Sequence, residues 1–343
     1  MKTPPVWKSS RRAFVRNAGL GLAACAFHQF APRALASTGG CASSAGPRAL
    51  VLIHLQGGHD SFNTFVPFQD DRYYRQRPTI AVQRGELIPL ANSVALNKAG
   101  QPLERLFKDG KMAVVFNVGP ESTTSSHYRS SEIWHTASAA NEVLYSGWAG
   151  RCFTQLQADG RPVQAFHASA TVPRIFIREE DRATRMLTTP DAQAFSQSLT
   201  TGDDPLAALA EIGERAGASE AAEIYFVSVS GFDTHASQAD SHNARMQSVA
   251  TALESFQRRL DQRGVGGRVL TMAFTEFGRS LGENSQGGTD HGGASSVFLL
   301  GNSVRGGLYN HTSLIDGATS GGAAPMDHRK VVRTVTHDWL GVP

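Results

Sequence analysis

Five apolar runs, each followed by a polar turn, constrain the fold of this chain more than any other feature of its sequence. They span residues 48–55, 111–118, 224–230, 269–274 and 296–300. A continuous apolar run of this length is typical of a strand that is buried on both faces of a parallel sheet. Because segments with helical patterns separate the runs, we predict an α/β fold with a doubly wound, mostly parallel sheet and helices on both faces.

The remaining segments divide into helices, weaker strands and loops. The helical patterns cover residues 102–108, 127–137, 149–158, 205–215, 240–262 and 326–340, and two weaker strand patterns cover 163–167 and 174–177. Residues 66–100 and 301–325 are rich in proline or glycine and are expected to be irregular. The sequence shows no internal repeat and no coiled coil.

Polar side chains follow several of the apolar runs directly, where a strand of the predicted sheet ends. Asp60 follows the first run, Ser126 the second, Asp233 and His235 the third, and Glu276 the fourth. Ligand sites in parallel sheets lie at the carboxyl ends of the strands. We therefore expect these side chains to gather at one edge of the sheet.

Residues 287–293 read Gly-Gly-Thr-Asp-His-Gly-Gly and place Asp290 beside His291 between two pairs of glycines. The glycines allow a tight turn and a close backbone approach. The loop leaves the fourth predicted strand, so it can reach the edge that carries the other polar groups. An alternative is a surface turn in which Asp290 caps the backbone.

Several carboxylates and histidines at one edge would repel one another unless a cation lies among them. The candidate metal ligands are Asp60, Asp233, His235, Asp290 and His291. Mixed oxygen and nitrogen donors suit zinc, manganese or iron better than calcium, and we expect one or two divalent ions, zinc or manganese before iron. Taken singly, each ligand has another explanation: a turn for Asp60, a helix cap for Asp233 and a solvated loop for His235.

Other histidines are candidates for further metal ligands, and two roles are possible for Ser126. The candidates for a further ligand are His127, His135, His311 and His328, whereas His54 is expected to be a core histidine. Ser126 stands at the start of a predicted helix, where its hydroxyl could act as a nucleophile or simply cap the helix. Thr124 and Ser125 compete for the nucleophilic role.

The N-terminal segment resembles a twin-arginine export signal. Ser10–Arg16 holds the paired arginines, an apolar stretch follows, and Ala34–Ala36 is a small-x-small cleavage signature. We expect a signal peptide at 1–36, a linker at 37–47 and a single domain at 48–343. The segment 1–36 carries six basic residues and no acidic one, so its removal changes the net charge from +3 to −3.

This charge gives no reason to expect binding to nucleic acid or to anionic membranes. The apolar stretch of the signal is too short and too rich in glycine for a stable membrane span. The predicted partners are the twin-arginine export machinery and a substrate, and the predicted location is the periplasm or outside the cell. Cys41 and Cys152 would remain after cleavage and could pair, and no Cys-x-x-Cys motif is present.

Several motifs together resemble a known family. They are LVLIHLQGGHDSFNTFVP, SSHYRSSEIWHT, FDTHASQ, TEFGRSLGENSQGGTDHG and the terminal DWLG. In this order, after a twin-arginine signal, they are similar to bacterial domain-of-unknown-function family 1501, a sulfatase-like branch of the alkaline-phosphatase superfamily. The resemblance covers nearly the whole chain after residue 36.

The resemblance implies an α/β sandwich with two metal positions and a Ser, Thr or formylglycine nucleophile that attacks phosphate or sulfate esters. It implies that Asp60 is the aspartate after the first strand and that Ser126 is the nucleophile. It assigns Asp233 and His235 to one metal position and Asp290–His291 to the other. The sequence lacks the Cys-x-Pro-x-Arg signature of formylglycine enzymes, and the usual third histidine has no clear match. His59 and Ser125 stand where the family has Asn and Arg.

These features predict a periplasmic, metal-dependent hydrolase of a phosphate or sulfate ester of a small molecule or glycan. Ser126 would attack, and Glu276, Arg279 or a metal-bound water would assist. The alternative is a non-catalytic exported binding or assembly protein that keeps the fold and a structural metal. A redox enzyme is disfavoured because the sequence has no haem, iron–sulfur or dinucleotide motif.

Overall fold

The structure is a computed structural model, which describes residues 46–122, 124–169, 171–182, 196–199, 204–311, 314–319 and 326–343. The predicted signal peptide at 1–36 and Cys41 lie outside these residues. The export signal, the cleavage site and a Cys41–Cys152 disulfide therefore stay predictions. Cys152 itself is buried, 5% exposed.

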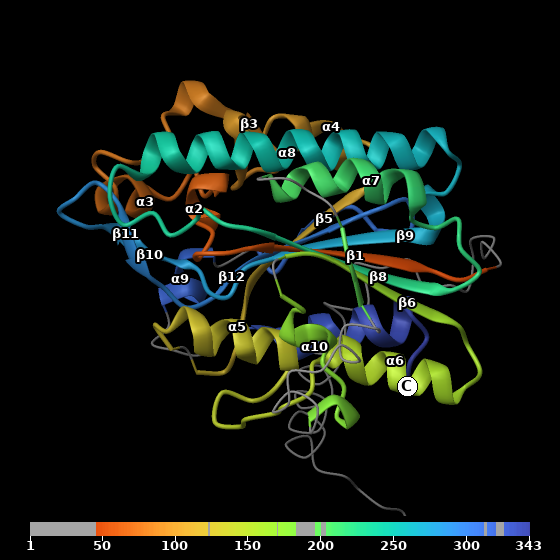
Figure 1. The fold of residues 1–343 in the computed structure, drawn as a ribbon. Helices are drawn as coiled ribbons and strands as arrows, with labels where there is room; N and C mark the ends of the chain where they lie inside the picture. Colours follow the sequence, from red (N-terminus) through yellow and green to blue (C-terminus); the bar gives the residue numbers. More distant parts are fainter. Residues whose placement is uncertain are drawn as a thin grey trace, which may run out of the picture.

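A nine-stranded sheet forms the centre of the fold (Figure 1). Its order is β13 (Gly307–Tyr309), β5 (Met112–Gly119), β12 (Ser295–Leu300), β9 (Val269–Phe274), β1 (Ala49–Leu55), β8 (Ala222–Val229), β6 (Val163–Ala168) and β7 (Ser196–Ser198), with β14 (Met326–Asp327) beside β5. Every pair of neighbours is parallel except the two pairs that β12 forms. The predicted α/β fold with a mostly parallel sheet is confirmed.

The reversed direction of β12 decides where the glycine-rich loop lies. β9 ends at Phe274, and the chain then forms the hairpin of β10 (Arg279–Glu283) and β11 (Thr289–His291) before β12 begins. Because β12 is antiparallel to β9, it starts at the edge where β9 ends. The excursion between them therefore stays at the carboxyl edge of the parallel strands.

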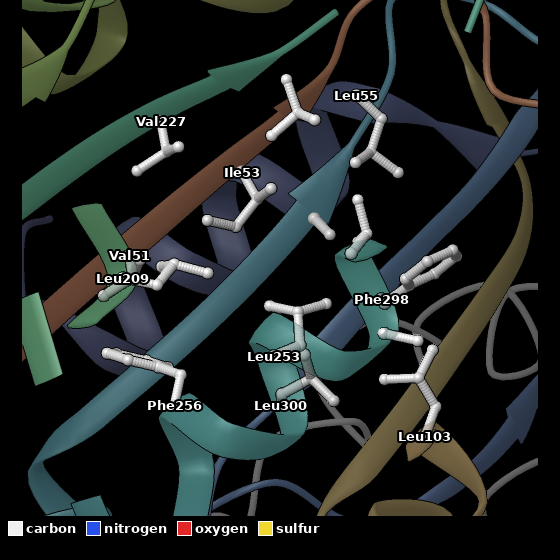
Figure 2. Close-up of a cluster of buried hydrophobic side chains, with 14 of the residues drawn as sticks. Val51, Ile53, Leu55, Leu103, Leu209, Val227, Leu253, Phe256, Phe298 and Leu300 are labelled. Atoms are coloured by element: carbon white, nitrogen blue, oxygen red, sulfur yellow. The ribbon is translucent and has the colours of Figure 1, made fainter. Parts of the chain in front are cut away.

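Helices cover both faces of the sheet. One face carries α4 (Pro102–Lys108), α7 (Ala208–Arg215) and α8 (Gln238–Gln262), and the other carries α5 (His127–Thr136), α6 (Trp148–Ala158) and α10 (His328–Arg333) (Figure 1). Successive side chains of β1 point to opposite faces. Val51, Ile53 and Leu55 face the α8 side with Leu253 and Phe256 (Figure 2), whereas Leu50 and Leu52 pack on the α5–α6 side. Both faces are covered, which is why the strand reads as one apolar run.

The shorter elements correct parts of the sequence prediction. Residues 174–177 are not a strand, because Arg174–Phe176 forms a 3₁₀ turn after Pro173. Residues 66–100 are less irregular than expected: they contain α3 (Asp71–Gln76) and two strands, β3 (Leu87–Pro89) and β4 (Ala95–Asn97), which join β2 (Phe65–Val66) in a small sheet. The remaining short elements are α2 (Ser61–Thr64), α9 (Leu314–Thr319), the 3₁₀ turns Arg84–Glu86, Lys98–Gly100, Glu180–Arg182, Pro205–Ala207 and Gly266–Arg268, and the π-helix Thr334–Trp339.

No helix within the described ranges combines the length and the apolar character that crossing a membrane requires.

Two histidines are wholly buried beside α8, and they make the fold sensitive to acid. His59 and His242 both contact the Thr64 hydroxyl, at 2.8 and 3.0 Å, and both are 0% exposed. Burial lowers the pKa of His59 to about 3 and that of His242 to about 4, from an ordinary 6.5. The unfolded chain therefore binds more protons than the folded one below pH 6.5, and stability is lost as the pH falls from 6.5 towards 4.

We expect the free energy of unfolding to fall by about 1.4 kcal/mol per pH unit for each of these protons below pH 6. Urea titrations at pH 7, 6, 5 and 4.5 measure this slope. His242→Gln should reduce the slope by the contribution of about one proton. His337→Gln, at a side chain that is 57% exposed, should leave the slope unchanged. A slope that is the same in the His242→Gln protein would contradict the assignment.

Candidate metal centre

Two loops meet closely at the carboxyl edge of the sheet because glycines stand where any side chain would collide. Gly57, after β1, has a φ of +120°, and a Cβ atom there would lie 2.3 Å from the backbone nitrogen of Asp233. A Cβ atom on Gly288 would lie 2.2 Å from the carbonyl carbon of His235. Gly57 and Gly288 therefore allow the turn after β1 and the β10–β11 hairpin to lie against the turn that follows β8.

Three imidazole rings surround the carboxylate of Asp233. The Nε2 atoms of His127, His235 and His291 lie 3.3, 3.0 and 3.2 Å from its oxygens. The rings come from three segments: His127 begins α5, His235 follows β8, and His291 ends β11. One ligand atom each from His127, Asp233 and His291 lies within 4.8 Å of the others, a spacing that fits a metal ion.

Hydrogen bonds on the far side of the rings fix which nitrogen carries the proton. His291 Nδ1 lies 2.9 Å from the carbonyl oxygen of Ser125, and His127 Nδ1 lies 2.8 Å from Oε1 of Glu276. A carbonyl and an ionised carboxylate can only accept, so both Nδ1 atoms donate. In the neutral rings, Nε2 then presents a lone pair towards Asp233.

Nε2 of His235 also faces Asp233 and His291. Its Nε2 lies 3.4 Å from Nη1 of Arg279, which can only donate, and 2.9 Å from Nε2 of His291. Its Nδ1 lies 3.8 Å from Oδ1 of Asp290. Nε2 of His235 therefore also points into the cluster.

A divalent cation fits this donor set. A cation between the three imidazole nitrogens and the carboxylate of Asp233 would be attracted by all four groups. Nε2 of His127 is buried and has no hydrogen-bond partner among the described residues, as expected of an atom that is reserved for a ligand. Imidazole nitrogen with one carboxylate oxygen is a donor set of zinc.

Glu276 and Arg279 lie behind the cluster. Glu276 is 0% exposed. Its burial raises the pKa of the carboxyl, but hydrogen bonds from His54 and His127 lower the pKa by more than burial raises it. The pKa of Glu276 therefore lies below its usual range. Arg279 is 2% exposed and donates to the backbone carbonyls of Gly58, Phe232 and Thr289 and to Asp233. Direct assistance by either residue stays untested, and their positions suit holding the ligands in place.

Asp60 and Asp290 do not join the three rings. Asp60 is 0% exposed and forms an ion pair with the equally buried Arg77, with Nη1 at 2.6 Å from Oδ2. It also caps α2 and accepts a hydrogen bond from Gln238. Asp290 precedes His291 in β11, so its side chain points to the opposite side of the strand. It is 73% exposed. Neither residue enters the metal set that we propose below.

Ser126 caps α5 beside the cluster. Its hydroxyl accepts a hydrogen bond from the backbone N–H of Arg129 at 3.3 Å, which confirms the expected cap. The side chain is exposed, and its two neighbours in sequence both contact the site, Ser125 through its carbonyl and His127 through its ring. Capping and nucleophilic attack both remain compatible with this position.

Of the residues predicted from strand ends and the glycine loop, Asp233, His235 and His291 come together. His127 joins them. Its place directly after Ser126, past the end of a buried strand, was the available signal. His135, also open as a ligand, instead packs edge-on against His54 with ring centroids 5.4 Å apart. His328 packs against Trp134.

Comparison with known proteins agrees with the family resemblance of the motifs. Residues 163–337 match the family described as "Protein of unknown function (DUF1501)". No curated protein matches the sequence.

Several solved structures are distantly similar. They include the C-terminal periplasmic domain of EptC from Escherichia coli in complex with Zn (11% identity, 90% of this chain and 86% of that one, TM-score 0.47). A protein in the alkaline phosphatase superfamily from Vibrio parahaemolyticus (9%, 89% and 69%, 0.45) and the lipoteichoic acid synthase LtaP from Listeria monocytogenes (9%, 91% and 77%, 0.48) are also similar. Likeness this distant transfers no activity to the chain.

Proposed function

Because the chain belongs to the family described as protein of unknown function (DUF1501), its activity has to be inferred from its own residues, and we propose that it is a metal-dependent hydrolase of phosphate or sulfate esters. The observation that carries the proposal is the convergence of three imidazole Nε2 atoms on the carboxylate of Asp233. The proposed metal ligands are His127, Asp233 and His291, with His235 as a fourth. Zinc or manganese fits these donors.

A bound divalent cation would withdraw charge from the ester oxygen. The chain supplies the other parts. Ser126 is exposed at the start of α5, where the free N–H groups of the first helical turn favour an anion. Its Oγ would form a bond to phosphorus or sulfur while the bond to the ester oxygen breaks, and the alcohol would leave with a proton. Water would then hydrolyse the serine ester and restore the hydroxyl.

The predicted signal peptide supports a location in the periplasm or outside the cell. The proposed substrate is an ester of a small molecule or glycan. The linker at 37–47 and the single domain at 48–343 complete this proposed organisation.

Replacement of Ser126 tests the nucleophile separately from the helix cap. Ser126→Ala removes both functions, whereas Ser126→Asn keeps a capping oxygen but has no hydroxyl. We expect both variants to lose aryl phosphate or aryl sulfate hydrolysis by about 10³-fold or more, the scale on which catalytic nucleophiles act. Initial rates with added zinc, manganese or magnesium measure this loss.

Ser131→Ala, five residues further along the chain in α5, is the matched control and should keep full activity. Activity retained in Ser126→Asn but lost in Ser126→Ala would leave Ser126 as a cap only. A wild-type protein that holds metal but cleaves no ester would favour the exported binding protein with a structural metal.

A further inference from the structure

Glu276 is a buried carboxylate beside the candidate metal centre, and both of its oxygens are occupied by neighbours. It follows β9, and each of its carboxylate oxygens has two neighbours. Oε1 accepts from His127 Nδ1 and from the backbone N–H of Gly57, both at 2.8 Å. Oε2 lies 3.3 Å from His54 Nε2 and 3.0 Å from the Thr275 hydroxyl.

These contacts leave no part of the carboxylate for a substrate. A buried carboxylate is tolerated only when hydrogen bonds replace its lost hydration, and Glu276 has four such contacts while it is 0% exposed. Its only neighbour that belongs to the proposed ligand set is His127. Whatever Glu276 contributes to the site must therefore pass through that ring.

We propose that Glu276 is the positioning residue of the metal site: it holds His127 with the proton on Nδ1 and with Nε2 aimed at the carboxylate of Asp233, and His54 braces it from β1. This inference deepens the proposed function and rests on it, because it presumes a metal between His127, Asp233 and His291.

His54, which contacts Glu276, belongs to the rigid sheet rather than to a loop. His54 lies in the middle of the sheet on β1, 3% exposed, and its ring stacks on Phe274 of β9 with centroids 5.0 Å apart and planes 6° from parallel. His127, by contrast, begins α5 after a loop. The contact through Glu276 thus ties a ligand at a helix start to two neighbouring strands. Outer hydrogen bonds of this kind orient imidazole ligands and raise their basicity.

The zinc affinity of the purified protein tests the role. Glu276→Gln keeps the shape of the side chain but loses its charge, and we expect it to bind Zn²⁺ about 10 to 100 times more weakly, the usual effect of removing such a contact. Competition with a chromophoric chelator measures the affinity. The visible absorption of the Co²⁺-loaded protein should also shift, which a general loss of stability would not produce in the folded fraction.

The matched control is Glu223→Gln. Glu223 is also a buried glutamate on a central strand, 3% exposed, and it accepts from the Gly217 N–H and the Tyr225 hydroxyl, remote from the metal ligands. It should leave the Zn²⁺ affinity and the Co²⁺ spectrum unchanged. His54→Phe, which removes only the contact between His54 and Glu276, should weaken Zn²⁺ binding by less than Glu276→Gln does.

The outcomes are distinct. Weaker Zn²⁺ binding and a shifted Co²⁺ spectrum in Glu276→Gln, with an unchanged Glu223→Gln protein, support the proposal. A metal-loaded wild type whose Glu276→Gln variant has unchanged affinity and spectrum overturns the positioning role alone. If Glu276→Gln does not fold, His54→Phe decides by the same two measurements. An unchanged Zn²⁺ affinity and an unchanged Co²⁺ spectrum in His54→Phe would then overturn the proposal. A wild type that binds no Zn²⁺ overturns the proposed function as well.

Discussion

Asp233→Asn is expected to remove the bound metal and, with it, ester hydrolysis. Among the residues that the structure describes, Asp233 is the carboxylate that all three imidazole rings approach, at 3.0 to 3.3 Å, so its replacement removes the charged ligand. We expect close to one metal ion per chain to be lost and the rate to fall by at least about 10³-fold, which corresponds to about 4 kcal/mol of the activation free energy. Elemental analysis and initial rates measure the two effects.

The fold should survive this change. Arg279, the buried partner of Asp233, keeps its backbone acceptors Gly58, Phe232 and Thr289, and an asparagine oxygen can still accept from it. Asp159→Asn, at an exposed position after α6, is the matched control and should retain metal and activity. An Asp233→Asn protein that keeps its full metal content would refute the ligand assignment.

Arg77→Met is expected to cause the largest loss of stability. Arg77 and Asp60 are both 0% exposed, and their side chains meet at 2.6 Å. The arginine pairs with Asp60 and also donates to the carbonyl oxygens of Ser280 and Leu281 at 2.8 Å. Removing it leaves a buried carboxylate without its counter-charge, which typically costs about 3–5 kcal/mol. Urea unfolding at neutral pH measures the loss.

The double variant Asp60→Asn/Arg77→Met should recover part of the lost stability, because no isolated charge then remains buried. Arg105→Met, at a surface ion pair whose arginine is 68% exposed, should change stability by less than about 1 kcal/mol. Metal content should stay at the wild-type level in folded Arg77→Met protein. A loss of metal that follows Asp60→Asn would instead return Asp60 to the ligand set.

The strands and the polar edge could be predicted because they depend on local patterns. A strand buried on both faces has to be apolar at every position, so β1, β5, β8, β9 and β12 are visible as runs. The carboxyl ends of parallel strands share an edge, which places Asp233 and Glu276 together. The start of α5 follows from the capping preference of Ser126.

The direction of single side chains could not be predicted in the same way. The glycine-rich sequence 287–293 predicts a loop, whereas the structure forms the hairpin of β10 and β11, and this strand geometry places Asp290 and His291 on opposite sides. The ion pair of Asp60 with Arg77 could not be predicted either, because Arg77 lies in the segment 66–100, which has no clear periodicity. The antiparallel direction of β12 also could not be predicted, because an apolar run does not show in which direction its strand crosses the sheet.

An anomalous difference map, recorded at the zinc absorption edge from crystals of the protein loaded with Zn²⁺, tests the metal centre most directly. The account predicts one peak about 2.0–2.2 Å from Nε2 of His127 and His291 and from an oxygen of Asp233, the bond lengths of zinc to nitrogen and carboxylate ligands. Zinc-loaded crystals with no peak among these three side chains, or with the peak at Asp60 instead, would contradict it.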